Sequence, residues 1–250
     1  MKEKIKNLFK DYQLLLKNVP ALVMTLFCAS VILMNLAANK TIVSIGSWFA
    51  LDGGILVSWL SFMTMDIVTK RFGPKAATRL SIVATLVNLL ACLVLFIVAK
   101  IPSSVDDYTA LNSIFGGTWF ILLSSTIAFI ASAIINNFMN SAIGKMFKRN
   151  PDGKAAYVTR TYISTFLGQF FDNLIFAALT FMLFAPIFWD GFSWTFLQCI
   201  TCALTGAVAE LIMEVIFSPI GYKICQKWKK ENIGKEYIEA HPELNWSKLF

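Results

Sequence analysis

Charge is scarce in this chain. Only 15% of its 250 residues are Asp, Glu, Lys or Arg, whereas 57% are hydrophobic. A soluble globular domain carries about 25% charged residues and about 45–50% apolar ones. This deficit excludes an ordinary soluble domain and predicts a membrane protein. The net charge of +7 then indicates orientation in a membrane and attraction to anionic lipid heads, and we expect no nucleic-acid partner.

Motifs for catalysis are also missing. The chain has one histidine, His241, which we expect to be exposed in a polar tail without a functional role. The sequence contains no HExxH, no GxSxG and no cluster of histidines, so we predict neither an enzyme nor a metal site, and no cofactor. A GxxxxGK[ST] loop is missing too, which excludes ATP hydrolysis by a P-loop in this chain.

Cysteine is sparse and does not suggest chemistry. The five cysteines lie in or beside apolar segments: Cys28, Cys92, Cys199, Cys202 and Cys225. Cys199 and Cys202 form a CxxC pair, but no second pair completes a metal site. We therefore expect these side chains to pack in the protein interior.

What the chain does have is six long apolar segments, at about 20–38, 54–72, 76–99, 118–144, 160–186 and 194–222. Each reaches or nearly reaches the ~20 residues with which a helix crosses ~30 Å of hydrocarbon. They predict an all-α membrane protein, with six transmembrane helices in one bundle formed by residues 20–222. Residues 1–19 predict an amphipathic helix on the cytoplasmic membrane surface, and residues 223–250 a cytoplasmic tail.

Two interruptions are also expected in this pattern. Residues 40–53 are mostly apolar but contain Gly46 and Gly53, and are too short to span twice. We expect them to form short extended or re-entrant backbone against the outer face. Pro219 should interrupt the last turns of the sixth segment, because proline removes a helical hydrogen bond.

Positive charge lies almost entirely on one side of the six segments. If the flanking regions alternate between inside and outside, Lys40 and Lys100 are the only two of the 22 Lys and Arg residues outside. Such a bias places the Lys- and Arg-rich regions in the cytoplasm. It predicts cytoplasmic termini and a multi-pass protein of the bacterial cytoplasmic (inner) membrane.

Four acidic residues lie within the apolar segments: Asp66, Asp172, Glu210 and Glu214. Each costs about 2.5–3.5 kcal/mol on insertion scales, so such side chains usually face the bundle interior and serve a function. Asp66 has a simpler alternative, a salt bridge to Lys70 one turn away. Glu210 and Glu214 share a helix face and repel each other, so one of them is expected to be protonated or paired.

Polar uncharged residues accompany these acids. Ser164 shares a face with Asp172 and can also serve close helix packing, because Gly168 follows at the spacing of small-residue contacts. Further amides and one aromatic side chain complete a polar seam through the apolar segments. Our candidate substrate-binding residues are Asp172, Gln169, Asn39, Asn35, Glu210, Glu214, Asp66, Ser164, Asn173, Phe176 and Asn137. Such a seam is what a small polar solute needs to cross the membrane.

Four stretches of the chain resemble the vitamin uptake transporter-like family, which includes queuosine precursor transporters. They are Asn35–Lys40, Asp66–Gly73, Arg160–Phe176 and Glu214–Pro219. The resemblance implies a six-helix fold similar to the substrate-binding subunits of energy-coupling-factor transporters. It also implies import of 7-cyano- or 7-aminomethyl-7-deazaguanine.

A guanine-like base presents two neighbouring N–H donors that one carboxylate can accept. Asp172 is then the expected carboxylate, with Gln169 and Asn39 as amide partners and Phe176 able to stack on the ring.

Three residues depart from the family pattern: Lys70, Asn140 and Glu210. Many relatives have an acid in place of Lys70, an aspartate in place of Asn140 and a lysine near Glu210. An acid in place of a cation changes the local charge by two units. Either the substrate carries a positive charge that replaces the missing cation, such as an aminomethyl group, or other charged side chains near Glu210 are rearranged.

The mode of transport stays open at this point. The chain can import its solute alone, or it can be a vitamin-binding subunit that docks to a separate ATP-driven coupling module. We favour the stand-alone importer. A different vitamin-like solute is also compatible with the sequence.

Overall fold

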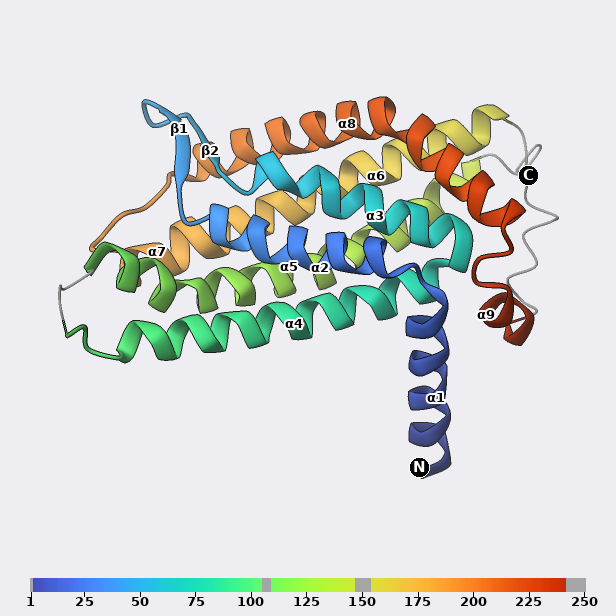
Figure 1. Ribbon diagram of the computed structural model, residues 1–250. Coiled ribbons are helices and arrows are strands. Elements are labelled where there is room, and N and C mark those ends of the chain that lie inside the picture. Colours follow the sequence, from blue (N-terminus) through green and yellow to red (C-terminus); the bar gives the residue numbers. More distant parts are fainter. Residues whose placement is uncertain (1, 105–108, 147–153, 242–250) are drawn as a thin grey trace. The chain divides into compact units, whose positions relative to one another are not determined.

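The computed structural model describes residues 2–104, 109–146 and 154–241, which are mostly helical (Figure 1). The elements follow the chain in the order α1 (Lys2–Asn18), α2 (Ala21–Ala37), β1 (Thr41–Ile45), β2 (Phe49–Asp52), α3 (Ile55–Phe72), α4 (Pro74–Lys100), α5 (Thr109–Met146), α6 (Lys154–Ala177), the π-helix η1 (Ala178–Phe184), α7 (Ala185–Phe188), α8 (Phe196–Lys230) and α9 (Lys235–Ala240). All six apolar segments of the sequence therefore form helices.

Four helical stretches are long and apolar enough to cross a membrane: Lys75–Lys100, Thr109–Ser132, Phe166–Phe188 and Phe196–Phe217. A fifth candidate is the pair Lys6–Asn18 and Ala21–Ala37, which is bent by 105° at its break. The break coincides with Pro20, whose ring disfavours helical backbone at the preceding residue. The apolar part of α3, Ile55–Thr69, is shorter. By length and composition, the protein thus has four to five candidate membrane-spanning helices.

The chain forms two compact units, which we describe separately. Unit 1 comprises Met1–Val31, Ser58–Asn88 and Glu214–Phe250, and unit 2 comprises Ile32–Val57 and Leu89–Met213. The helices α2, α3, α4 and α8 each contribute one part to each unit.

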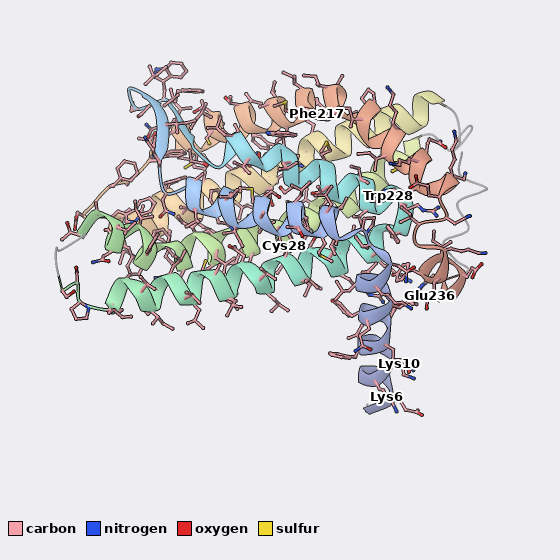
Figure 2. The ribbon with its side chains drawn as sticks, viewed as in Figure 1. Lys6, Lys10, Cys28, Phe217, Trp228 and Glu236 are labelled. Atoms are coloured by element: carbon pink, nitrogen blue, oxygen red, sulfur yellow. The ribbon has the colours of Figure 1, made fainter. Side chains whose placement is uncertain are left out.

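The core of unit 1 gathers apolar side chains from α1, α2, α3, α4, α8 and α9. Phe72 is fully buried and lies edge-on to the rings of Trp228 and Tyr237, with ring centroids 6.0 Å apart in both pairs. Figure 2 shows Trp228 near the end of α8. Gly234 has φ +76°, and a Cβ there would lie 2.2 Å from the Phe72 ring. Glycine is therefore required where the chain turns into α9.

The helix α8 continues through Pro219 as far as Lys230. The interruption that we expected at Pro219 is therefore wrong. Trp228 is buried and Cys225 packs against the same core of unit 1. We attribute the continuity to this packing, which offsets the one hydrogen bond that proline removes.

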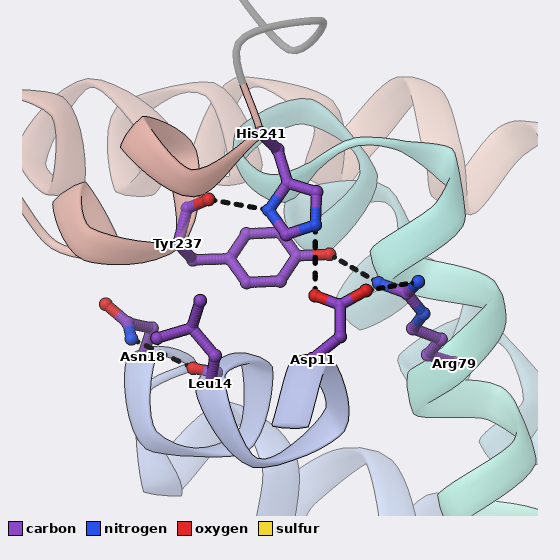
Figure 3. Close-up of polar contacts among 6 residues, drawn as sticks. All are labelled: Asp11, Leu14, Asn18, Arg79, Tyr237 and His241. Atoms are coloured by element: carbon purple, nitrogen blue, oxygen red, sulfur yellow. Dashed lines mark hydrogen bonds and ion pairs between the residues drawn. The ribbon is translucent and has the colours of Figure 1, made fainter. Parts of the chain in front are cut away.

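A polar cluster ties α1 to α4 and α9 within unit 1 (Figure 3). Asp11 forms ion pairs with Arg79 at 2.5 Å and with His241 Nε2 at 3.0 Å. Arg79 also donates to the Tyr237 hydroxyl at 3.0 Å, and the Tyr237 ring stacks on His241. The expectation that His241 is exposed is thus wrong, because α9 folds back and places the imidazole against Asp11.

Unit 2 contains the antiparallel hairpin of β1 and β2, which has an irregularity between Thr41 and Val43. Residues 40–53 are therefore extended backbone, one of the two alternatives expected from the sequence. The start of α8 holds the hairpin tip through side chains that donate to backbone carbonyls. Gln198 Nε2 donates to Gly46 O at 3.1 Å, and Thr201 Oγ1 donates to Trp48 O at 2.7 Å.

The α-helix α6 continues directly into the π-helix η1. In η1 the backbone widens to a π-helix, and the N–H of Ala185 bonds to Thr180 O, five residues back. Pro186 follows directly and cannot donate to the carbonyl of Met182, which favours this shifted pattern. The π-helix positions Thr180 and Phe181, which are both fully buried. Such π-segments often occur at functional sites.

Candidate functional site

The polar face of α6 forms the centre of the candidate site. Asp172 is partly buried, and its Oδ1 atom lies 2.8 Å from the hydroxyl of Ser132 on α5. The same hydroxyl lies 3.0 Å from Phe129 O, so it can donate its proton to either oxygen. Gln169 lies one turn before Asp172 and Asn173 on the helix. This part of α6 therefore presents one carboxylate and two amides within an apolar helix.

The helix α8 approaches α6 closely at Gly206. A Cβ at this residue would lie 2.7 Å from Asn173 Nδ2 and 3.2 Å from its Cγ. The Nδ2 atom of Asn173 is buried and has no hydrogen-bond partner among the described residues. Glycine at this position thus leaves room for the Asn173 amide.

On the face of α8 that contains Gly206, buried residues lie both before and after this glycine. They are Cys199, Cys202, Ala203, Gly206, Ala207 and Glu210. Four helical residues correspond to about 6 Å along the axis, so Cys202, Gly206 and Glu210 lie on successive turns. Glu210 is only 7% exposed. This face therefore has an acid at one end and contacts Asn173 at its middle.

Toward the start of α8, Cys202 on this face lies near a second buried acid, Asp52, which we did not predict from the sequence. Asp52, the last residue of β2, is 7% exposed and accepts a hydrogen bond from the Gly54 N–H at 2.7 Å. Its Oδ2 atom lies 3.9 Å from Cys202 Sγ. Burial raises the pKa of Asp52 to about 6, against the opposing effect of the Gly54 hydrogen bond. The sequence signal was the Asp-Gly-Gly run, which also fits an ordinary turn.

The C-terminal end of α2 adds buried amides. Asn35 is 1% exposed, and neither its Oδ1 nor its Nδ2 atom has a hydrogen-bond partner among the described residues. Asn39, one turn later, donates to Leu36 O at 3.0 Å. Between them, Ala38 packs against Phe120 and Ile121 of α5. Asn35 in α2 and Asn39 in the following turn therefore lie on either side of Ala38, which is buried in unit 2.

Phe176 connects the two apolar clusters of unit 2. It packs against the cluster of Ala38 and Phe120, and also against the cluster that contains Ala50, Phe181 and Cys202. Its ring is perpendicular to that of Phe181, with centroids 6.3 Å apart. The ring thus lies one turn beyond Asp172 on α6, packed against both clusters.

The structure places seven of the eleven candidate residues in unit 2 with described side chains: Asn35, Asn39, Gln169, Asp172, Asn173, Phe176 and Glu210. Ser164 and Asn137 also belong to unit 2, but their side chains lie outside the described part. Asp66 and Glu214 belong to unit 1, and their side chains are likewise not described.

Residues 52–224 match the family model described as “Putative vitamin uptake transporter”. The chain belongs to this family. The matched range includes Asp52 and the whole buried face of α8 from Cys199 to Glu210. No solved structure matches the chain.

One named protein is similar to this chain. It is the “Probable queuosine precursor transporter” of Bacillus subtilis (strain 168), which is 31% identical over 154 residues. The match covers 59% of this chain and 63% of the Bacillus protein, which is less than two thirds of that protein's length. Residues 52–224 of this chain therefore carry the family identity, and the named relative indicates which solutes to consider.

Two further buried polar groups escaped the sequence analysis of this family member. Trp194 is 4% exposed, stacks on Phe181 with centroids 3.9 Å apart, and has an indole N–H without a partner among the described residues. The hydroxyl of Thr180 in the π-helix is also buried without a described partner. Tryptophan and threonine are common in apolar segments, so the sequence contained no signal for these roles. Buried polar groups without partners need an explanation, so both groups belong to the candidate site.

Proposed function

We propose that this protein is a membrane transporter that imports a queuosine precursor, 7-cyano- or 7-aminomethyl-7-deazaguanine. The arrangement of Asp172 with Ser132 and the buried amides Asn35 and Asn173 carries the proposal. Such groups are costly within an apolar protein unless they bind something. Membership of the vitamin uptake transporter family and the name of the Bacillus relative support the same solute class.

The recognition chemistry follows from the edge of a guanine-like base. The base offers a ring N–H and an exocyclic amine side by side, and the two oxygens of Asp172 can accept both. The amides of Gln169, Asn173 and Asn39 supply donors and acceptors for the remaining edge. Phe176 offers an aromatic face next to these groups, on which the flat base can stack.

We propose the predicted topology for the whole chain. Six helices span the membrane in one bundle, as in the substrate-binding subunits of energy-coupling-factor transporters, and both termini lie in the cytoplasm. The four to five candidate spans and the distribution of Lys and Arg support this arrangement, with α3 as the additional span. Residues 1–19 form a surface helix, residues 20–222 the transmembrane domain and residues 223–250 a tail. The location is the bacterial cytoplasmic membrane.

The proposal is tested by queuosine formation in living cells. The host is a bacterium that lacks precursor synthesis and its own importer, and it receives nanomolar deazaguanine with this protein expressed. We expect queuosine in its tRNA with the unchanged protein and with Asp190→Asn, an exposed acid of the turn before α8. Asp172→Asn should abolish queuosine at equal protein levels in the membrane.

Two results would contradict the proposal. Absence of queuosine with the unchanged protein present in the membrane would refute the solute. Full queuosine formation with Asp172→Asn would refute the site, because the carboxylate would then make no contact that transport requires.

A further inference from the structure

We propose that the ligand of the unit 2 site carries a positive charge, and that Asp52 is one of the carboxylates that neutralise it. This inference rests on the proposed function, because it specifies which deazaguanine the transporter prefers. The aminomethyl base carries an amine that is protonated at neutral pH, whereas the cyano base is uncharged. Asp52 belongs to none of the substrate contacts proposed above.

Among the described side chains of unit 2, two acids near the proposed site lie away from solvent without a basic partner. Asp52 is buried and Asp172 is partly buried. The basic residues of this unit whose side chains are described are Lys40 and Lys100, and both are exposed. Among the described residues, no lysine or arginine forms an ion pair with Asp52 or Asp172. A buried charge without a partner is expensive, so a ligand with its own cation would gain most from this interior.

Asp52 has only neutral hydrogen-bonding neighbours among the described residues. Its Oδ1 atom accepts the N–H of Gly54, and its Oδ2 atom faces the thiol of Cys202 at 3.9 Å. A thiol is a weak donor, which leaves most of the accepting capacity of Oδ2 unused. A ligand ammonium group has three donors and a full positive charge, and it satisfies such an oxygen with a charge-assisted bond.

Two buried polar groups without described partners also point to a polar ligand. Trp194 packs in the same apolar cluster as Cys202, and its buried indole N–H has no described partner. Asn35 lies one turn before Ala38, whose Cβ is 3.5 Å from the Cβ position of Gly54, directly beside Asp52. Its amide is 1% exposed and has no described partner at either atom. Asn35 thus lies near the turn that holds Asp52, and Trp194 lies in the cluster of Cys202, each with unused hydrogen-bonding capacity.

The face of α8 connects this region to the proposed base-binding groups. Cys202 contacts Asp52, and Gly206, about 6 Å further along the helix, contacts Asn173. Asn173 is the neighbour of Asp172 in α6. A base whose guanine-like edge is bound by Asp172 can thus direct a short charged substituent along α8 toward Asp52.

The experiment is equilibrium binding to the purified full chain in lipid nanodiscs at pH 7, measured by calorimetry. The probes are 7-aminomethyl-7-deazaguanine and 7-cyano-7-deazaguanine. We expect the aminomethyl base to bind the unchanged protein at least tenfold more tightly. Asp52→Asn should weaken binding of the aminomethyl base at least fivefold and change binding of the cyano base by less than twofold. Asp52→Glu should retain the preference, and the exposed control Asp190→Asn should leave both affinities unchanged.

The outcomes separate this inference from the proposed function. Equal or tighter binding of the cyano base by the unchanged protein overturns the inference and leaves the proposed function in place. Binding of neither base overturns both. Equal weakening of both bases by Asp52→Asn shows that Asp52 only supports the fold, which overturns its role. The comparison on the unchanged protein decides the charge preference even if Asp52→Asn does not fold.

Discussion

At the scale of residues, the close approach of Gly206 to Asn173 is the feature of the candidate site that a substitution can test most simply. The space for any side chain at Gly206 is already filled by the Asn173 amide. Because that amide has no described partner for its Nδ2 atom, the glycine serves to keep it in place without competing for its hydrogen bonds. The same contact lies between α6 and α8, so we expect a change at Gly206 to affect both stability and ligand binding.

Gly206→Ala should therefore harm the protein although alanine is a better helix former. The added methyl group must displace Asn173, and overpacking of this kind costs about 1–3 kcal/mol. We expect a lower midpoint temperature of thermal unfolding and at least tenfold weaker binding of the deazaguanine. Gly116→Ala in α5 is the matched control, because its Cβ would meet only Ala99 at 3.9 Å. That change should be neutral or stabilising by about 0.5–1 kcal/mol; equal effects of both changes would contradict the account.

Asp52 should make stability depend on pH in a defined window. The pKa of this buried carboxyl is about 6 in the folded protein, against about 3.9 in an unfolded chain. Between these values the folded state binds the proton more tightly, so stability falls as pH rises from about 4 to about 6, by at most about 3 kcal/mol. Asp52→Asn removes this contribution.

The measurement compares midpoint temperatures of thermal unfolding for the ligand-free protein and for Asp52→Asn from pH 4 to pH 7. The unchanged protein should lose stability relative to the variant as pH rises through this window, and the difference should be constant above it. A difference that is independent of pH would show that Asp52 is not buried as described.

The sequence predicted the burial of some polar residues but not of others. Asp172 stood out because an acid in the middle of an apolar segment is expensive. Asp52 did not, because it precedes two glycines at the edge of a segment and its burial depends on how the hairpin folds onto α2 and α8. His241 was misjudged for a similar reason, since only the folding of α9 against α1 brings Asp11 within 3.0 Å. Periodicity cannot reveal contacts between distant segments.

At the scale of elements, the β1–β2 hairpin determines where Asp52 lies. Side chains of α8 bind backbone carbonyls at the tip of the hairpin. At its base, the Gly53 N–H donates to Lys40 O at 2.8 Å, and Gly53 passes close to Ala37 O at the end of α2. A Cβ at Gly53 would lie only 2.6 Å from that oxygen. The hairpin is therefore held at both ends, which keeps the Asp52 carboxylate beside Cys202.

Gln198→Leu should loosen this hairpin, because it removes the donor to Gly46 O and leaves a carbonyl unpaired. A typical hydrogen bond contributes about 0.5–1.5 kcal/mol, so hydrogen exchange of hairpin amides should accelerate about 2- to 10-fold. Thr205→Val is the control, because the Thr205 hydroxyl donates to Thr201 O within α8. Mass spectrometry of peptides from residues 41–52 measures the effect. Unchanged exchange in Gln198→Leu would contradict the anchoring role.

The sequence predicted most elements but not their local winding. The six apolar segments and the extended stretch 40–53 could be recognised because length and glycine content are local properties. The π-helix η1 could not, because Pro186 was read as part of a continuous span. Pro219 was given too much weight, since packing of Trp228 and Cys225 in unit 1 maintains α8 beyond it.

At the scale of the whole molecule, the distribution of basic residues is the feature on which our proposed orientation rests. All but Lys40 and Lys100 of the 22 Lys and Arg residues fall on one side of the proposed spans. Both of these residues are exposed. Lys40 directly precedes the hairpin, and Lys100 is the last residue of α4. The side that bears the hairpin is therefore the outer side in our proposal.

Labelling with a membrane-impermeant maleimide tests this orientation. The background is a functional chain whose five native cysteines are replaced by alanine. Lys40→Cys should react in intact cells, because the positive-inside rule places it outside. Lys6→Cys in α1 should react only after the membrane is permeabilised. The reverse pattern would contradict the proposed topology.

The most direct test of the central claim is counterflow of radiolabelled 7-aminomethyl-7-deazaguanine into proteoliposomes that contain the purified protein. Counterflow needs no energy source, so it tests transport and solute together. We predict accumulation of label in liposomes preloaded with unlabelled base, retained in Asp190→Asn and lost in Asp172→Asn. No accumulation above protein-free liposomes, or full accumulation with Asp172→Asn, would contradict the claim that this polar interior conducts a queuosine precursor.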